Sequence, residues 1–276
     1  MGMESKVIVI TGASSGIGAA LAKQLGEEGH RLVLAARREK ELNAVVTACG
    51  AQARAVVTDV LQRAQVDRLK DEALKAFGQV DVWINNAGRG IGKKVLELTD
   101  DDFDQMMAIN VKSALYGIQA VVPHFQERKE GQLINVSSFL GRVPLASYRS
   151  AYNAAKAALN ALTANLRMDL AAAYPGIQIG LVMPGPVSTD FSNNALGGTP
   201  MVPPPRLTAV QTADDVADVI AGMIENPRAE VYTSPTLRAL TKRYYEDVAG
   251  FEAGMSAPAL AAPNLQALAD RLKKRE

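Results

Sequence analysis

Tyrosine and lysine stand four residues apart in Ser150-Ala-Tyr-Asn-Ala-Ala-Lys156, a segment that opens an Ala- and Leu-rich run to Leu170. If this run is helical, Tyr152 and Lys156 lie on one face, one turn from each other. A phenol with a pKa of about 10 is a poor acid at neutral pH, and a neighbouring ammonium favours the phenolate and lowers that pKa. The pair therefore suits proton transfer, although the same spacing also occurs on solvated helix faces.

A glycine-rich turn near the N-terminus suits phosphate binding. Lys6 to Thr11 has the β-branched composition of a strand buried on both faces, and Thr11-Gly-Ala-Ser-Ser-Gly-Ile-Gly18 leads from it into a helical pattern. In this setting Gly12 would permit the tight turn, Gly16 the approach of a pyrophosphate and Gly18 close packing of the helix. The N-terminus of the helix would face the phosphates. The alternative is an ordinary strand-to-helix turn.

A second apolar run at 31–36 ends in Arg37 and Arg38. NAD-binding proteins place an acidic residue here for the ribose 2′-hydroxyl, whereas a guanidinium presents paired donors to a 2′-phosphate. The sequence therefore predicts a preference for NADP(H) over NAD(H). A solvent-facing arginine is the alternative, and Glu39 lies close by.

Four later apolar runs have the composition of strands, and each ends in polar or turn-forming residues. The runs cover 53–58, 80–84, 132–136 and 177–183, and they are followed by Asp59-Val60, Asn85 to Gly88, Ser137-Ser138 and Pro184 to Thr189, respectively. Because the carboxyl ends of parallel strands meet at one edge of a sheet, these residues are expected to share a ligand-binding edge.

Helical patterns separate these strands and predict the fold class. They cover 39–49, 62–77, 102–127, 152–173 and 212–225, and a short strand at 230–233 follows. This alternation predicts an α/β fold with a Rossmann-like, doubly wound parallel sheet of about seven strands and helices on both faces. We expect a single domain over residues 1–276. It would have its core at 5–233, a substrate lid at 190–210 and a C-terminal helical extension at 234–276.

Single residues within the helical patterns carry further expectations. Pro123 is expected to kink or end the helix at 102–127 and to leave His124 on the surface. Asn110 interrupts the same helix, where its side chain either faces solvent or holds a water. One helix is expected after Ser234-Pro235, with a face made of Leu237, Leu240, Tyr244 and Val248.

Composition excludes several classes of partner. Lys and Arg number 30 against 29 Asp and Glu, so a net charge of +1 gives no global attraction to nucleic acid or to an anionic membrane. A single cysteine, Cys49, and two separated histidines give no disulfide and no metal-ligand spacing. The apolar run Val7 to Ile10 is too short for a signal peptide or a membrane span. We expect a cytoplasmic protein without a catalytic metal.

The chain resembles the short-chain dehydrogenase/reductase family on several motifs that stand in the family's order. These are Thr11 to Gly18, Asn85 to Gly88, Asn110, Ser138, Tyr152 to Lys156 and Pro184-Gly185, and they cover about residues 5–233. The resemblance implies direct hydride transfer between a nicotinamide cofactor and the carbonyl carbon of a ketone or aldehyde. The last forty or so residues lie outside the resemblance.

The resemblance implies four catalytic residues. Tyr152 would exchange a proton with the substrate oxygen, and Ser138 would hydrogen-bond that oxygen. Lys156 would hold the nicotinamide ribose and lower the pKa of Tyr152, while Asn110 would anchor a water that links Lys156 to solvent. Ser138 and Tyr152 are fourteen positions apart where thirteen is commoner in the family. The extra residue is interpreted as loop length, since Ser137 would be farther still.

The resemblance also implies the cofactor contacts. The pyrophosphate would lie on Gly12, Ser14, Ser15, Gly16, Ile17 and Gly18, the 2′-phosphate on Arg37, with Arg38 as a further cofactor residue beside it, and the adenosine on Asp59, Val60, Asn86, Ala87 and Gly88. The nicotinamide end would lie against Tyr152, Lys156, Pro184, Gly185, Val187 and Thr189.

The segments expected to wall the substrate site beside Ser138 are largely apolar. They supply Phe139, Leu145 and Phe191, together with Met183, Leu196, Met201 and Leu207. Such pockets bind by apolar contact, so we expect a bulky, largely apolar ketone or aldehyde. These side chains alternatively pack the lid onto the domain, and a preference for keto acids would indicate a carboxylate clamp by Arg142, Arg149 or Arg206.

Two other functions stay open at this point. One is an acyl-thioester or sugar ketoreductase, and the other is a non-catalytic NADP(H)-binding regulator, which would be expected to lack Tyr152 or Lys156. We also expect a homodimer or homotetramer, because the helices at 102–127 and 152–173 carry apolar or small residues around much of their circumference. The family resemblance implies pairing through these helices.

Overall fold

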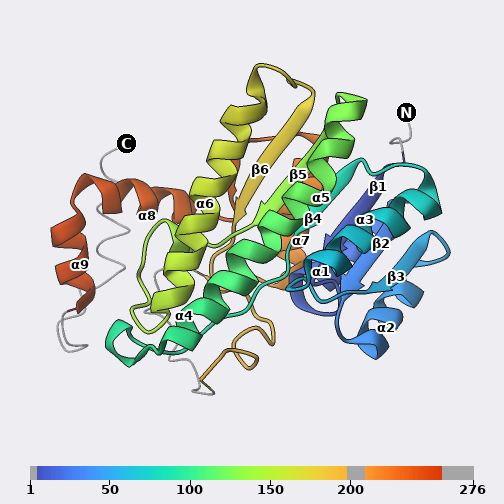
Figure 1. The fold of residues 1–276 in the computed structure, drawn as a ribbon. Helices are drawn as coiled ribbons and strands as arrows, with labels where there is room; N and C mark the ends of the chain where they lie inside the picture. The colour runs from blue at the N-terminus through green and yellow to red at the C-terminus, as the bar shows by residue number, and fades with distance from the viewer. Residues whose placement is uncertain (1–4, 198–208, 257–276) are drawn as a thin grey trace.

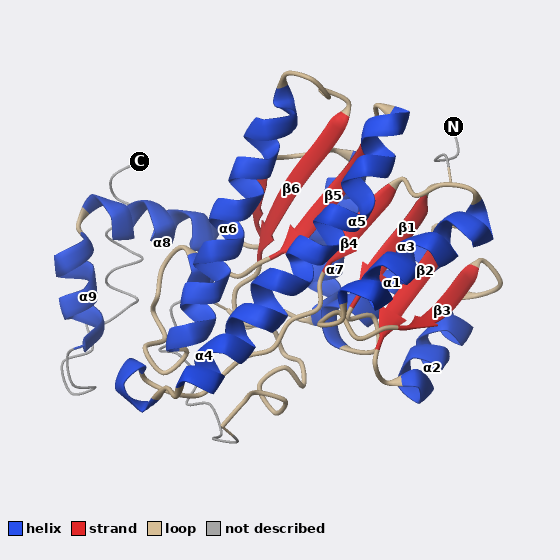
Figure 2. Ribbon diagram, in the orientation of Figure 1, coloured by secondary structure: helices blue, strands red, loops and turns tan. Residues whose placement is uncertain are grey.

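A seven-stranded parallel sheet forms the centre of the described part of this computed structural model, which comprises residues 5–197 and 209–256 (Figures 1 and 2). The strands are β1 (Val7–Thr11), β2 (Arg31–Ala36), β3 (Ala53–Val57), β4 (Val82–Asn85), β5 (Gly131–Val136), β6 (Ile177–Met183) and β7 (Glu230–Tyr232). Their order is β3-β2-β1-β4-β5-β6-β7, and each neighbouring pair is parallel. The predicted doubly wound α/β fold is confirmed.

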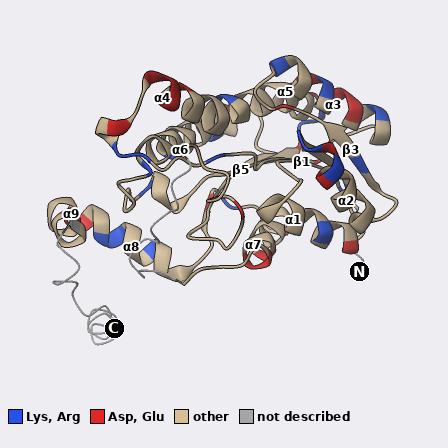
Figure 3. Ribbon diagram, turned by 90° about the horizontal axis from the view of Figure 1, so that it is seen from below, with Lys and Arg blue, Asp and Glu red and all other residues tan. Residues whose placement is uncertain are grey.

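Helices cover both faces of the sheet, which Figure 3 shows from below. On one side lie α1 (Gly16–Glu27), α2 (Glu39–Cys49) and α7 (Ala213–Glu225), and on the other lie α3 (Arg63–Phe77), α4 (Asp100–Met107), α5 (Ser113–Arg128) and α6 (Ser150–Ala171). Side chains of β1 alternate between the two layers: Ile8 and Ile10 pack with Leu21 of α1, and Val9 packs with Leu69 of α3. The strand is buried on both faces for this reason, as its unbroken apolar run predicted.

The helix expected at 102–127 is divided by a π-helical stretch, η2 (Ala108–Lys112), into α4 and α5. Pro123 was expected to kink or end the helix. It does not end it, because α5 continues through Pro123 to Arg128, and the kink stays a prediction. Phe125, two residues further on, is fully buried in the core, and this packing keeps the helix running past the proline. His124 is half-buried and accepts a hydrogen bond from the amide of Val80, so it is not a simple surface residue.

The C-terminal part of the described chain forms two helices where one was expected. They are α8 (Pro235–Glu246) and α9 (Val248–Ser256), and Asp247 between them has φ −153° and ψ 84°, which no helix can continue. The expected lid at 190–210 is described only in part, since 198–208 lie outside the described residues, as does the chain after 256. Among the helices that are described, none is long and apolar enough to cross a membrane.

Candidate active site

The sequence-predicted catalytic residues meet at the carboxyl edge of the sheet, where the arrowheads in Figure 2 point and where α6 begins. Ser138 follows β5, and its Oγ accepts a hydrogen bond from the amide of Leu140 at 3.1 Å, which starts the short helix η3 (Phe139–Gly141). The hydroxyls of Ser138 and Tyr152 are hydrogen-bonded to each other. Ser137 instead donates to Asn160 at 2.6 Å, so the choice of Ser138 over Ser137 agrees with the geometry.

Lys156 lies one helical turn after Tyr152, with its Nζ 5.7 Å from the centre of the tyrosine ring. The ammonium donates to the carbonyl of Val136 at 3.0 Å, and the residue is only 4% exposed. Burial disfavours the charged form and lowers the pKa of Lys156 to about 8. The amine is therefore poised to gain or lose its proton close to neutral pH.

Burial raises the pKa of Tyr152, because the phenolate would lie among apolar side chains. Two neighbours act against this rise, namely the charge of Arg149 and the hydrogen bond with Ser138. The sequence assigned this effect to Lys156. In the structure Arg149 is the cation that lowers the pKa of Tyr152. Burial disfavours the charged form of Lys156, so its ammonium does not take this role.

Asn110 is buried in the π-helical stretch and holds the loop after β4. Its Nδ2 donates to the carbonyls of Arg89 at 2.9 Å and Met106 at 3.1 Å, and its Oδ1 accepts from the amide of Arg89 at 3.2 Å. A Cβ built on Gly88 would lie 2.9 Å from this Oδ1 and 3.5 Å from Nζ of Lys156. The structure thus places both Asn110 and Lys156 beside Gly88 of the Asn-Asn-Ala-Gly motif, and the water expected at Asn110 stays a prediction.

The glycine turn is braced from the end of β4. Asn86 Nδ2 donates to the carbonyls of Thr11 at 3.0 Å and Gly12 at 3.3 Å, and the hydroxyl of Thr11 accepts from the amides of Asn86 and Ala87. The same hydroxyl donates to the carbonyl of Ile84. Asn86 therefore shapes the turn through its side chain, and its expected contact with the cofactor stays a prediction.

The glycines leave a cradle of backbone that a dinucleotide pyrophosphate fits. Gly12 has φ +69°, and a Cβ on it would lie 2.9 Å from the Cα of Ala87; a Cβ on Gly18 would lie 2.5 Å from the carbonyl oxygen of Gly12. Ser15 is the N-cap of α1, and its side chain makes no capping hydrogen bond to the first turn of the helix. The Ser15 hydroxyl therefore does not occupy the first-turn amides, which point toward the sheet edge. Thr189 closes the other side, 3.4 Å from a Cβ on Gly16.

Arg38 reaches back over this cradle. Its Nη2 donates to the hydroxyls of Ser14 at 3.1 Å and Ser15 at 2.7 Å. Arg37 is also exposed at the end of β2, next to the buried Ala36. The sequence assigned the 2′-phosphate to Arg37, whereas in the structure it is the neighbouring Arg38 that contacts the serines of the glycine-rich turn, and both cofactor roles stay predictions.

The remaining predicted cofactor residues lie along the same edge. Asp59 follows β3 and its Oδ1 accepts from the amide of Leu61, while Val60 is buried beneath it. Pro184 accepts a hydrogen bond from the amide of Phe139 at 2.8 Å, and Val187 pairs with Gln211. The first of these two contacts holds the chain after β6 against the chain after β5, and the second holds it against the chain before α7.

The predicted substrate residues separate into two groups. Phe191 lies against Tyr152, with ring centres 5.6 Å apart in an edge-to-face arrangement. Phe139 and Leu145 instead pack with Leu237 of α8 in a different cluster, and their place in the wall of the substrate site stays a prediction. Sequence alone does not show this, because the cluster needs the C-terminal helix to fold back over residues 139–145.

Arg149 is a site residue whose role the sequence reasoning missed. It stands three positions before Tyr152, and its guanidinium carbon is 5.6 Å from the centre of the Tyr152 ring and 5.5 Å from that of Phe191. The i, i+3 spacing to the tyrosine was the signal that would have placed it on the catalytic face.

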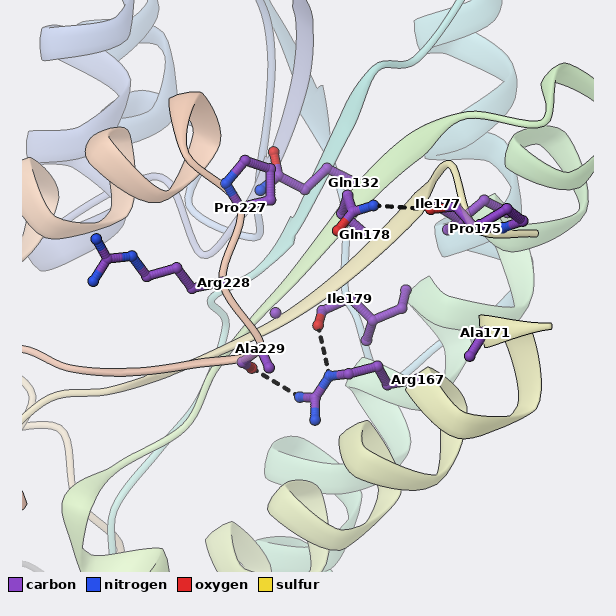
Figure 4. Close-up of a pocket in the computed structure, with 11 residues that line it drawn as sticks. Gln132, Arg167, Ala171, Pro175, Ile177, Gln178, Ile179, Pro227, Arg228 and Ala229 are labelled. Atoms are coloured by element: carbon purple, nitrogen blue, oxygen red, sulfur yellow. Dashed lines mark hydrogen bonds between the residues drawn. The ribbon is translucent and has the colours of Figure 1, made fainter. Parts of the chain in front are cut away.

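A separate hollow of about 260 Å³ lies at the amino ends of β5 and β6, beside the C-terminal half of α6 (Figure 4). Arg167 crosses it and donates to the carbonyls of Ile179 and Ala229. None of the predicted site residues lines this hollow.

Known proteins with similar sequences and structures agree with this geometry. The short chain dehydrogenase family model matches residues 6–197. An uncharacterized oxidoreductase of Staphylococcus epidermidis is 33% identical over 214 residues, which are 78% of this chain and 90% of the relative. An uncharacterized oxidoreductase of Bacillus subtilis is 32% identical over 242 residues, which are 86% of this chain and 68% of the relative.

Two of the similar solved structures come from Burkholderia. A short chain dehydrogenase/reductase of Burkholderia phymatum in complex with NAD has a TM-score of 0.81 and 29% identity, covering 94% of this chain and 99% of the other. A short chain dehydrogenase of Burkholderia cenocepacia in complex with NADP has a TM-score of 0.77 and 29% identity, covering 94% and 100%. The chain belongs to the short-chain dehydrogenase/reductase family and is an NAD(P)-dependent oxidoreductase.

Proposed function

We propose that this protein interconverts a ketone or aldehyde and the corresponding alcohol, with NADPH as its preferred cofactor and Tyr152 as the general acid and base. The observation that carries the proposal is the hydrogen-bonded pair of Ser138 and Tyr152 beside Lys156, at the sheet edge that also bears the glycine cradle. A bound nicotinamide would supply the hydride for reduction and accept it for oxidation.

The side chains divide the proton chemistry between them. In reduction, the hydroxyls of Ser138 and Tyr152 hydrogen-bond the substrate oxygen, and Tyr152 gives its proton to that oxygen as the carbon receives the hydride. The resulting phenolate is stabilised by nearby positive charge and regains a proton from solvent. Lys156 is suited to this relay because its pKa is lowered to about 8. A positioned acid of this kind contributes about 10² to 10⁴ in rate.

The preference for NADPH rests on charge at the end of β2. The chain has Ala36 followed by two arginines where an acidic residue would hydrogen-bond the ribose of NAD. Arg38 is positioned by Ser14 and Ser15 beside the pyrophosphate cradle, which puts a planar donor group within reach of a 2′-phosphate. The Burkholderia relatives were crystallised with NAD in one case and NADP in the other, so the preference is argued from these residues alone.

The substrate proposed is a bulky, largely apolar ketone or aldehyde. Tyr152 belongs to an apolar cluster with Ile91 and Met106, and Phe191 and Leu196 of the described lid segment pack against this cluster. Apolar walls with a few polar groups at the reacting oxygen bind such substrates. An acyl-thioester substrate is the second candidate, because a 3-ketoacyl-(acyl-carrier-protein) reductase of Brucella melitensis has a TM-score of 0.74 and 27% identity, covering 83% of this chain and 96% of the other.

Replacing Tyr152 by phenylalanine tests the proposal. A panel of cyclic and aromatic ketones, short keto acids and 3-ketoacyl thioesters is screened for NADPH consumption by the parent, and the best substrate is then used with the variant. We expect Tyr152→Phe to lose at least about 10²-fold in kcat while its affinity for NADPH stays nearly unchanged, because only the transferable proton is removed. A variant that keeps half of the parent turnover would refute the role of Tyr152, and a clear preference for keto acids would refute the apolar substrate.

A further inference from the structure

We propose that Arg149 is a positioning residue for the catalytic tyrosine: it lies against the rings of both Tyr152 and Phe191, ties segment 189–197 to the acid, and places a permanent positive charge beside it. The inference rests on the proposed function only for the role of Tyr152. It adds a residue that belongs to none of the catalytic or cofactor motifs found in the sequence.

The guanidinium is held by two aromatic rings at once. Its central carbon is 5.6 Å from the ring centre of Tyr152 and 5.5 Å from that of Phe191, within the range of favourable cation–π contact. The residue is only 6% exposed, so solvent screens these interactions little. The planar, delocalised cation of arginine suits such stacking better than the compact ammonium of lysine.

Polar contacts fix the same side chain from several segments. Nη2 of Arg149 donates to the hydroxyl of Ser192, the neighbour of Phe191, at 3.4 Å, and the side chain is also hydrogen-bonded to Tyr148. A Cβ on Gly90 would lie 2.9 Å from Nη1, so the loop after β4 passes directly over the guanidinium. The backbone of Arg149 is bridged to Lys93 in that same loop.

The lid segment is joined to this loop independently. Leu196 is bridged to Ile91: its amide donates to the carbonyl of Gly90 at 2.9 Å, and its carbonyl accepts from the amide of Gly92 at 3.1 Å. Arg89 Nε also donates to the carbonyl of Asn194 at 2.7 Å. Arg149 therefore lies where three segments meet: the loop after β4, the start of α6 and residues 189–197. A side chain at this junction couples the position of the Tyr152 ring to the position of the lid.

The effect of the Arg149 charge on the pKa of Tyr152 has to be weighed against the other charged side chains of the neighbouring elements. On the described elements packed around it these are Lys156 on α6, Arg89 and Lys93 on the loop after β4, Asp102 on α4 and Asp190 in the lid segment. Lys93 is paired with Asp102 at 2.6 Å.

Lys156 has a pKa of about 8 and so loses its charge before a phenol titrates. Burial also lowers the pKa of Arg149, but an arginine stays protonated in proteins. At the pH where Tyr152 ionises, Arg149 is the adjacent cation that persists. Its charge favours the phenolate and opposes the rise in pKa that burial causes.

A spectroscopic titration of Tyr152 tests this without any turnover. The near-ultraviolet absorbance of phenolate is followed against pH in the parent, Arg149→Met and Arg149→Lys, each minus the same protein carrying Tyr152→Phe, so that one tyrosine is isolated. We expect the Tyr152 midpoint to rise by at least about one pH unit in Arg149→Met, the usual effect of removing a charge at 4–6 Å, and most of this rise to be absent in Arg149→Lys. Arg149→Gln serves as a second neutral variant if Arg149→Met does not fold.

Arg142→Met is the matched control, because it removes a partly buried arginine of the same loop whose guanidinium contacts Glu230 instead. Its Tyr152 midpoint should not move. Equal midpoints in the parent and in the neutral Arg149 variants, or an equal shift in Arg142→Met, would overturn the proposal. This result is independent of whether Tyr152→Phe abolishes turnover, so the two proposals fail separately.

Hydrogen exchange tests the second half of the inference. Amides of 190–197 should exchange at least about tenfold faster in Arg149→Met than in the parent or in Arg142→Met. In Arg149→Lys the exchange should also be faster although the midpoint is retained, because an ammonium keeps the charge and loses the planar stacking on Phe191. Exchange in this segment at the parent rate in both Arg149 variants would show that Arg149 does not hold the lid.

Discussion

Lys156 should make the protein less stable at neutral pH than a chain without it. The residue is buried, and burial lowers its pKa from 10.5 to about 8. At about 1.4 kcal/mol for each tenfold change in proton affinity, this fall corresponds to a cost of about 3 kcal/mol for folding with the amine protonated. Lys156→Met removes that cost and with it the proposed relay to Tyr152.

The pH dependence of stability separates the cost of burying the protonated Lys156 amine from any change in packing. Below pH 8 Lys156 is protonated in the folded and the unfolded chain, and the full cost is present. Between 8 and 10.5 the folded chain releases its proton first, so the unfolded chain binds more protons and the stability of the parent rises with pH relative to the variant. Lost packing and the lost hydrogen bond to Val136 do not vary in this way.

The assay is thermal unfolding of the parent and Lys156→Met without cofactor, from about pH 7 to about pH 11. The stability of the variant minus that of the parent should fall by about 3 kcal/mol over this range, or roughly 6 °C in Tm for a chain of this size. Lys23→Met, which removes an exposed lysine of α1, is the control and should show no such fall. A constant difference between the parent and Lys156→Met would refute the buried-charge argument.

Three further predictions concern the cofactor, the core and assembly. Arg38→Ala should lower the ratio of kcat/KM for NADPH over NADH by roughly ten- to a hundredfold, because a charge-assisted hydrogen bond contributes about 1.5 to 3 kcal/mol; an unchanged ratio in Arg38→Ala and in Arg37→Ala would contradict the assignment. Gly117→Ala should lower the free energy of unfolding by about 1–3 kcal/mol, since a Cβ there would lie 2.2 Å from Oδ1 of Asn85. Gly222→Ala should instead raise the free energy of unfolding by up to about 1 kcal/mol, because the space around Gly222 is open and alanine is the better helix former. Equal urea midpoints for these two variants would contradict the steric argument. Light scattering at micromolar concentration should give a multiple of 29.3 kDa for a homo-oligomer paired through α5 and α6, and a single-chain mass would contradict it.

Local patterns predicted the elements that end where the residue type changes abruptly. The bounds of β2, α2 and β6 were predicted to the residue, because unbroken apolar runs and capped helical patterns end at charged residues, glycine or proline. The helix does not end at Pro123, because the burial of Phe125 outweighs a lost backbone hydrogen bond. The pairing of Arg149 with Phe191 joins residues 42 positions apart across a loop contact. No periodicity records such a contact.

The bracing of the glycine turn has a consequence for how tightly and how fast a nucleotide binds. Asn86 and Thr11 fix the turn through hydrogen bonds within the protein, so its backbone is already ordered before a ligand arrives and little conformational entropy is lost on binding. The side of the turn next to Thr189 differs, since the Thr189 side chain lies 3.4 Å from where a Cβ on Gly16 would be and, within the described part of the chain, shares no hydrogen bond with the glycine-rich turn. The nucleotide should therefore associate rapidly with the preordered glycine-rich turn. Its residence time should be governed by the opening of the segment that begins at Thr189.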